Sequence, residues 1–137
     1  MENPIIENFG EMVHDNTIKG YSVDFVNETL QMVTENEDKK TILITFNGLL
    51  AHSFENVINC NIILDLYQLS IIDYVNENTD SINESLKYCF PSMKSRNSQE
   101  LEKELIDNAY KLFEFNASIG LVGYVIAKNL TIEPGKR

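Results

Sequence analysis

The sequence contains few cysteines and few basic residues, and both scarcities exclude classes of protein. Cys60 and Cys89 are the only cysteines, and they form no Cys-x-x-Cys pair. Eleven lysines and arginines stand against 21 aspartates and glutamates, which gives a formal net charge of −10. Because nucleic-acid phosphates and anionic membranes repel such an acidic protein, we expect neither as a partner.

A secretion signal and a membrane span are also missing from the sequence pattern. Residues 1–4 begin acidic, whereas a signal peptide begins with basic residues and continues with a long apolar stretch. The longest apolar run, residues 120–127, is far shorter than the ~20 residues of a membrane helix. We therefore expect a cytoplasmic protein whose two cysteines stay reduced.

The overall composition is that of an ordinary globular domain. The chain has 137 residues, of which 43% are hydrophobic and 23% are charged. It contains no internal repeat and no low-complexity linker, so we predict a single domain over residues 1–137. A domain of this length buries roughly two thirds of its unfolded surface, which supports a core without a metal or a disulfide.

Alternation of apolar and polar residues predicts strands in two parts of the chain. We predict strands at residues 21–26, 30–34, 42–46, 61–66, 110–115 and 121–126. The polar residues 35–40 form a hairpin loop in this scheme. Asn47-Gly48 is typical of a tight hairpin turn, which would make residues 49–54 a return strand. Alternatively, Gly48 only bends the chain into a loop.

Residues 70–90 change to a helical period and predict one long helix or two collinear helices. Ser70 is the expected N-cap, and Pro91 ends the segment. At 100° per residue, one side carries Ile71, Ile72, Val75, Ile82, Leu86 and Phe90. The opposite side carries Asp73, Glu77, Asp80 and Glu84, which we call the acidic stripe.

Two shorter helices complete the prediction. One begins at Ser98 as its cap, and the other covers residues 5–13 with Asn3 and Pro4 at its start. Strands, then helices, then strands again are typical of the α+β class. We predict an antiparallel sheet of five or six strands with two or three helices packed on one face.

Catalytic motifs are not found in the sequence. There is no Gly-x-Ser-x-Gly elbow and no glycine-rich phosphate loop. A zinc site needs three or four ligands, and His52, Glu55 and Cys60 could contribute only if the fold brought them together. His14 and Asp15 are neighbours whose side chains we expect to diverge. We therefore predict no enzyme, no cofactor and no metal. The alternative from the enzyme class is a small hydrolase with His52 as the base.

The acidic stripe is the candidate binding site. Like charges three and four residues apart repel each other on a helix, and no lysine or arginine lies within the stripe. Such a surface fits a basic partner protein, which complementary charge would steer toward it. The alternative is a solvated face that serves only solubility in a domain with a housekeeping role.

A resemblance to a protein family agrees with a binding function. Residues 12–18 contain His14-Asp15-Asn16-Thr17-Ile18, which resembles the His-Asp-x-x-Ile opening of small acidic bacterial proteins similar to immunity proteins of polymorphic toxin systems. Residues 46–54 and 61–66 resemble further stretches of these proteins. The resemblance implies an antiparallel sheet decorated by helices, no catalysis, and neutralisation of a cognate toxin. Because the chain is acidic, we expect that toxin to be a basic domain such as a nuclease.

Overall fold

A computed structural model describes residues 5–135 of the chain, and in this range it contains nine strands and four helices. The strands are β1 (Ile5–Asn8), β2 (Thr17–Asp24), β3 (Thr29–Glu35), β4 (Thr41–Asn47), β5 (Ala51–Glu55), β6 (Asn61–Leu69), β7 (Lys111–Ile119), β8 (Val122–Ala127) and β9 (Asn129–Pro134). The helices are α1 (Gly10–Val13), α2 (Ile71–Glu77), α3 (Thr79–Leu86) and α4 (Ser98–Asp107). None of the helices described is long and apolar enough to cross a membrane.

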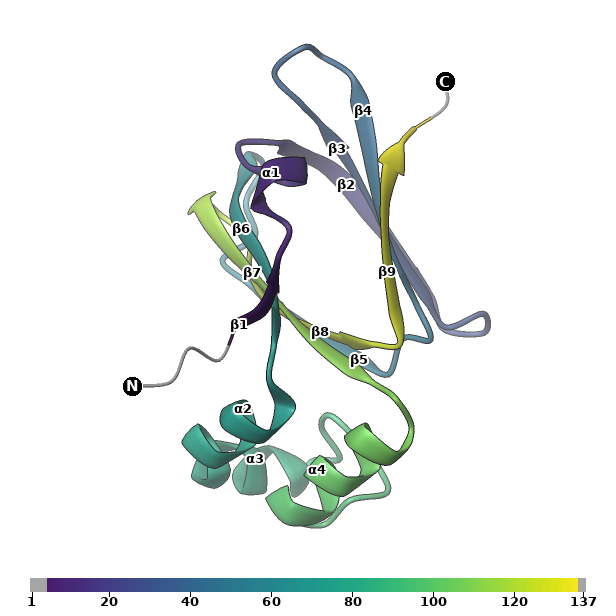
Figure 1. Ribbon diagram of the computed structural model, residues 1–137, viewed down its shortest axis with the longest axis vertical. Helices are drawn as coiled ribbons and strands as arrows, with labels where there is room; N and C mark the ends of the chain where they lie inside the picture. Colours follow the sequence, from purple (N-terminus) through teal and green to yellow (C-terminus); the bar gives the residue numbers. More distant parts are fainter. Residues whose placement is uncertain (1–4, 136–137) are drawn as a thin grey trace.

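The strands form one antiparallel sheet that folds over on itself. Its order is β5-β8-β7-β6-β2-β3-β4-β9, and β1 adds to β6. Strand β4 pairs with β9, beginning with Ile42 opposite Pro134, and β5 pairs with β8, ending with Glu55 opposite Val122. Because β5 follows β4 and β9 follows β8 along the chain, the two pairs form one continuous ribbon. This long ribbon joins the two halves of the sheet, which face each other in Figure 1.

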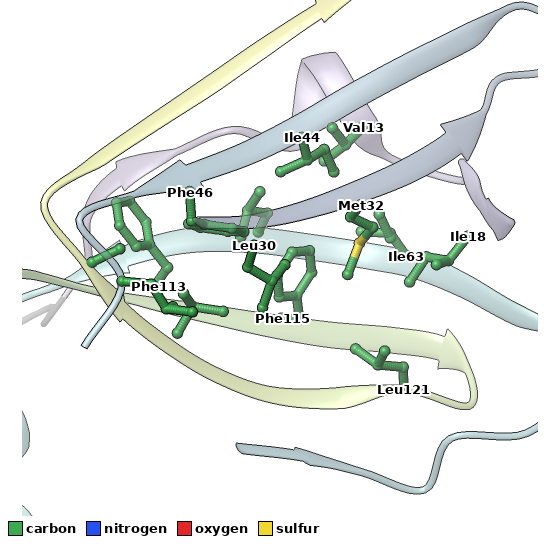
Figure 2. Close-up of a cluster of buried hydrophobic side chains, with 14 residues drawn as sticks. Val13, Ile18, Leu30, Met32, Ile44, Phe46, Ile63, Phe113, Phe115 and Leu121 are labelled. Carbon is green, nitrogen blue, oxygen red and sulfur yellow. The ribbon is translucent and has the colours of Figure 1, made fainter. Parts of the chain in front are cut away.

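The main core fills the space between the two halves. Alternating side chains of the facing strands point into this space, as the period of two predicts. Phe46 from β4 packs against Phe113 and Phe115 from β7, with ring centroids 5.2 and 6.0 Å apart (Figure 2). The other buried members are Val13, Ile18, Leu30, Met32, Ile44, Leu49, Ile63, Leu66, Leu121, Val125 and Ala127.

A second core lies between the helices and one half of the sheet. Leu69 of β6, Leu112 of β7 and Ile126 of β8 are cross-strand neighbours that bury one face of this half. The helices contribute Val75, Ile82, Leu86, Leu101 and Leu105 to the same cluster. Figure 1 shows α2, α3 and α4 grouped at one end of the molecule, where this cluster lies.

The α+β class and the antiparallel sheet are confirmed, but the number of strands was predicted too low. Nine strands are present within residues 5–135, where five or six were predicted. The segment predicted as a helix over residues 5–13 is strand β1 followed by the single turn α1. Its predicted start at Asn3 and Pro4 lies outside the described residues. Segment β1 is a strand because it pairs with β6, and segment β9 is a strand because it pairs with β4. Local periodicity does not predict such tertiary pairing.

The hairpin predicted at Asn47-Gly48 is wrong, and the alternative bend is correct. Strand β5 pairs with β8 and not with β4. Gly48 has a φ of +67°, a conformation that glycine adopts readily, and the chain continues in the same ribbon beyond it. The Asn47 carbonyl accepts from the Lys128 amide at 2.9 Å, and the Leu50 amide donates to Ile126 at 2.8 Å.

The helical segment after Ser70 consists of two helices separated at Asn78. Ser70 is the N-cap as predicted, since its hydroxyl oxygen accepts a hydrogen bond from the Asp73 amide at 3.3 Å. Two residues predicted on the inward side are exposed, Ile72 by 50% and Phe90 by 41%. Phe90 lies beyond the end of α3, so helical spacing no longer decides its direction.

The N-cap of helix α4 lies one residue earlier than the sequence pattern indicated. Asn97, and not Ser98, is the N-cap, because its side-chain oxygen accepts from the Glu100 amide at 2.9 Å. Ser98 is buried, and its amide donates to the Asn83 side chain of α3 at 2.8 Å. This bond ties the start of α4 to α3.

Candidate functional site

The acidic stripe lies on α2 and α3. Glu77, Asp80 and Glu84 are exposed, and Asp73 is half-buried at the first turn of α2. Glu84 is neutralised by Lys87 one turn further on, with 2.9 Å between the carboxylate oxygen and the ammonium nitrogen. Within residues 5–135, the other three carboxylates of the stripe form no ion pair. No ion pair therefore neutralises the negative charge of these three side chains.

Apolar side chains are exposed on the same helical segment and just after it. Ile72 lies on α2 and is half-exposed. Tyr88, Phe90 and Met93 are exposed in the segment after α3. Exposed apolar groups bordered by charge are common in protein–protein interfaces.

The segment that carries these apolar groups is held in place by one carboxylate. The hydroxyls of Ser92 and Ser95 both donate to the Glu104 carboxylate of α4, at 2.7 and 2.6 Å. Both serines are buried, so Glu104 satisfies two hydroxyls that water does not reach. Tyr88 and Met93 are thus presented on a fixed loop.

His52, Glu55 and Cys60 are not brought together by the fold. His52 and Glu55 lie three residues apart on strand β5, where alternation sends their side chains to opposite faces. The His52 ring packs on Phe54 at 5.4 Å, and burial lowers the pKa of His52. Cys60 is exposed in the following loop. In the described range, no group of three or more His, Cys, Asp or Glu side chains could hold a metal ion.

The predicted divergence of His14 and Asp15 is wrong. Asp15 adopts a φ of +67° in a turn, and its carboxylate lies 3.4 Å from the His14 ring. The other ring nitrogen of His14 lies 2.9 Å from the Leu64 carbonyl. The Leu64 carbonyl and, to a smaller extent, Asp15 raise the pKa of His14, whose side chain is about half-exposed. The pair is a surface feature of this turn.

A cavity between the helices and strands β5 and β8 was not predicted from the sequence. Its volume is about 200 Å³. The buried side chains of Val75, Ile82, Leu101, Leu105, Leu112 and Ile126 form its apolar part. The exposed residues Glu55, Ser81 and Phe90 lie at its rim. Its lining comes from six elements spread between β5 and β8 along the chain, so no local pattern could have revealed it.

Two tyrosines form the polar wall of this cavity. The rings of Tyr74 from α2 and Tyr124 from β8 lie 5.3 Å apart. Burial raises the pKa of Tyr124, and the neighbouring Glu114 carboxylate raises it further. Tyr124 therefore keeps its proton throughout the neutral pH range, and its hydroxyl interacts with the Glu114 carboxylate.

The comparisons with known proteins assign no role to these features. Comparison with protein-family models, curated proteins and solved structures finds no significant match. The function is therefore inferred from the charge, exposure and geometry described above.

Proposed function

We propose that the protein is a non-catalytic binding protein that docks a basic partner through the acidic stripe, as an immunity-type inhibitor of a toxin domain such as a nuclease. The observation that carries the proposal is the group of Asp73, Glu77 and Asp80 on α2 and α3, which form no ion pair within residues 5–135. The resemblance of residues 12–18 to immunity-type proteins supports the same function.

Electrostatics explains how such a surface would act. Asp73 and Glu77 are four residues apart on α2, and Asp80 and Glu84 have the same spacing on α3. Each like-charge pair costs the helix a few tenths of a kcal/mol in the free protein. A basic partner relieves this repulsion, and the net charge of −10 accelerates its approach.

The exposed apolar groups would supply binding energy that charge alone does not provide. Charge complementarity governs the rate of association and the choice of partner, whereas buried apolar anchors provide most of the binding energy. Ile72 is exposed on α2, and Tyr88 is exposed shortly after α3. The same segment of the chain therefore offers exposed apolar side chains as well as the charges of the stripe.

If the proposal is correct, a basic toxin domain is encoded beside the gene for this chain, and the experiment measures association with that domain. The test variant reverses three members of the stripe, Asp73→Lys, Glu77→Lys and Asp80→Lys. The control variant reverses three exposed carboxylates elsewhere, Glu37→Lys, Asp38→Lys and Glu133→Lys. Both variants change the net charge equally, so a difference between them reports position and not total charge.

We expect the stripe variant to fold normally and to associate at least about tenfold more slowly at low salt, with a weaker salt dependence. The control variant should lose much less. In cells, wild-type protein should protect growth against the toxin domain, and the stripe variant should not. Equal loss in the two variants would mean that the acidic stripe is only a solvated face.

A further inference from the structure

The cavity between the helices and strands β5 and β8 has the form of a small-molecule site. About 200 Å³ of space lies between aliphatic side chains of α2, α3, α4, β7 and β8, and it opens to solvent beside exposed residues at its rim. The side chains that line this recess lack contacts that a close-packed interior would supply. By comparison, an apolar cavity of about 150 Å³ holds benzene, so the volume here fits about eight non-hydrogen atoms.

One end of the cavity is acidic. Tyr124 lies directly opposite Glu114 of β7 on one side and Ser53 of β5 on the other. Glu55 is two residues from Ser53 and therefore on the same face of β5, diagonal to Tyr124. Both carboxylates raise the pKa of Tyr124 through their charge, which places them near its hydroxyl.

Positive charge is missing from the cavity lining. Among the described residues that line it, none is a lysine or an arginine. His52 also borders the space, but its side chain lies on the opposite face of β5 from Glu55, with its ring packed on Phe54. An anionic ligand would thus meet the Glu55 carboxylate and no cation, whereas a cation would meet this carboxylate and the rings of Tyr74 and Tyr124.

We propose that this cavity binds a compact apolar molecule that carries an ammonium group. The apolar body lies among Val75, Leu105 and Ile126. The ammonium group lies at the rim, over the rings of Tyr74 and Tyr124 and beside the Glu55 carboxylate. This activity is independent of the docking of a protein at the acidic stripe.

The test uses three probes of similar size, benzylammonium, benzyl alcohol and benzoate, titrated into the full chain with detection by backbone amide NMR. We expect saturable shifts at the amides of Ser85 and Tyr124 with benzylammonium, weaker binding of benzyl alcohol and no binding of benzoate. Glu55→Gln should weaken benzylammonium binding about fivefold, in line with an exposed ion pair. Glu133→Gln on β9 is the matched control and should leave binding unchanged.

A second variant tests the location. Ser85→Leu adds an apolar side chain to the cavity wall and should abolish binding while the far strands keep their amide shifts. Because Glu55 is exposed, the Glu55→Gln comparison remains decisive even if Ser85→Leu folds poorly. The proposal is overturned if benzylammonium gives no saturable shift, if the three probes bind equally, or if Glu55→Gln binds as wild type does.

Discussion

The side-chain oxygen of Asn61 accepts a hydrogen bond of 3.0 Å from the backbone amide of Leu121, a residue 60 positions further along the chain. The same oxygen accepts from the Ile58 amide at 3.2 Å, and the Asn61 nitrogen donates to the Ile58 carbonyl at 2.6 Å. Asn61 is buried, so these bonds are shielded from water. One amide side chain thus fixes the start of β6 against the turn between β7 and β8.

Removal of this side chain should destabilise the fold. We expect Asn61→Ala to lower the free energy of unfolding by about 1–3 kcal/mol, because the buried Leu121 amide loses its acceptor. Asn59→Ala, at an exposed position in the same loop, is the control and should change stability by less than about 0.5 kcal/mol. Urea denaturation followed by circular dichroism measures both. Equal effects would show that the bond contributes little.

Two isoleucines of the helical segment test the assignment of its buried side. Ile82 on α3 is 6% exposed, whereas Ile72 on α2 is 50% exposed. Ile82→Asp should cost several kcal/mol and unfold much of the protein, since it places an unpaired charge in the second core. Ile72→Asp should leave the thermal midpoint nearly unchanged. If both substitutions cost the same, the orientation of these helices is wrong.

Glu104 should be required for the order of the loop after α3. Glu104→Ala leaves the buried hydroxyls of Ser92 and Ser95 without their acceptor, and we expect a loss of about 1–3 kcal/mol. Amide hydrogen exchange should rise over residues 88–97 in particular. Glu102→Ala removes a carboxylate from the same helix outside this network and should leave exchange unchanged. Uniform acceleration across the molecule would instead indicate global destabilisation.

The two histidines should titrate on opposite sides of their ordinary pKa of 6.5. The Leu64 carbonyl and Asp15 raise the pKa of His14, so its contribution to stability is complete below pH 6.5 and is lost as pH rises through the raised value. Burial lowers the pKa of His52, so its contribution is complete above pH 6.5 and is lost as pH falls through the lowered value.

Ring NMR signals measure these two titrations separately. His14→Gln removes the ring signal of His14 and thereby assigns the remaining signal to His52. The higher pKa should disappear with this substitution, and the lower one should remain. Coincident titration of both rings at 6.5 would contradict the surroundings described for each residue.

The local sequence pattern predicted the strands in which one face is more deeply buried than the other. Leu30, Met32 and Thr34 on β3 are buried, while their neighbours Gln31 and Val33 are less so, and the alternation is visible in the sequence. Strands β1, β5 and β9 lack such a contrast or follow a misleading turn signal. Their structure depends on pairing with β6, β8 and β4, which are distant in sequence.

The sequence by itself determined the α+β class, the capped helix after Ser70 and the spacing of the acidic stripe, because each depends on residues within a turn or two of one another. The tertiary structure alone decided the closing ribbon of β4–β5 with β8–β9, the separation of His52 from Glu55 and the cavity beside Tyr124. These features depend on which distant segments meet, and that choice is made by burial of the whole apolar surface rather than by local periodicity.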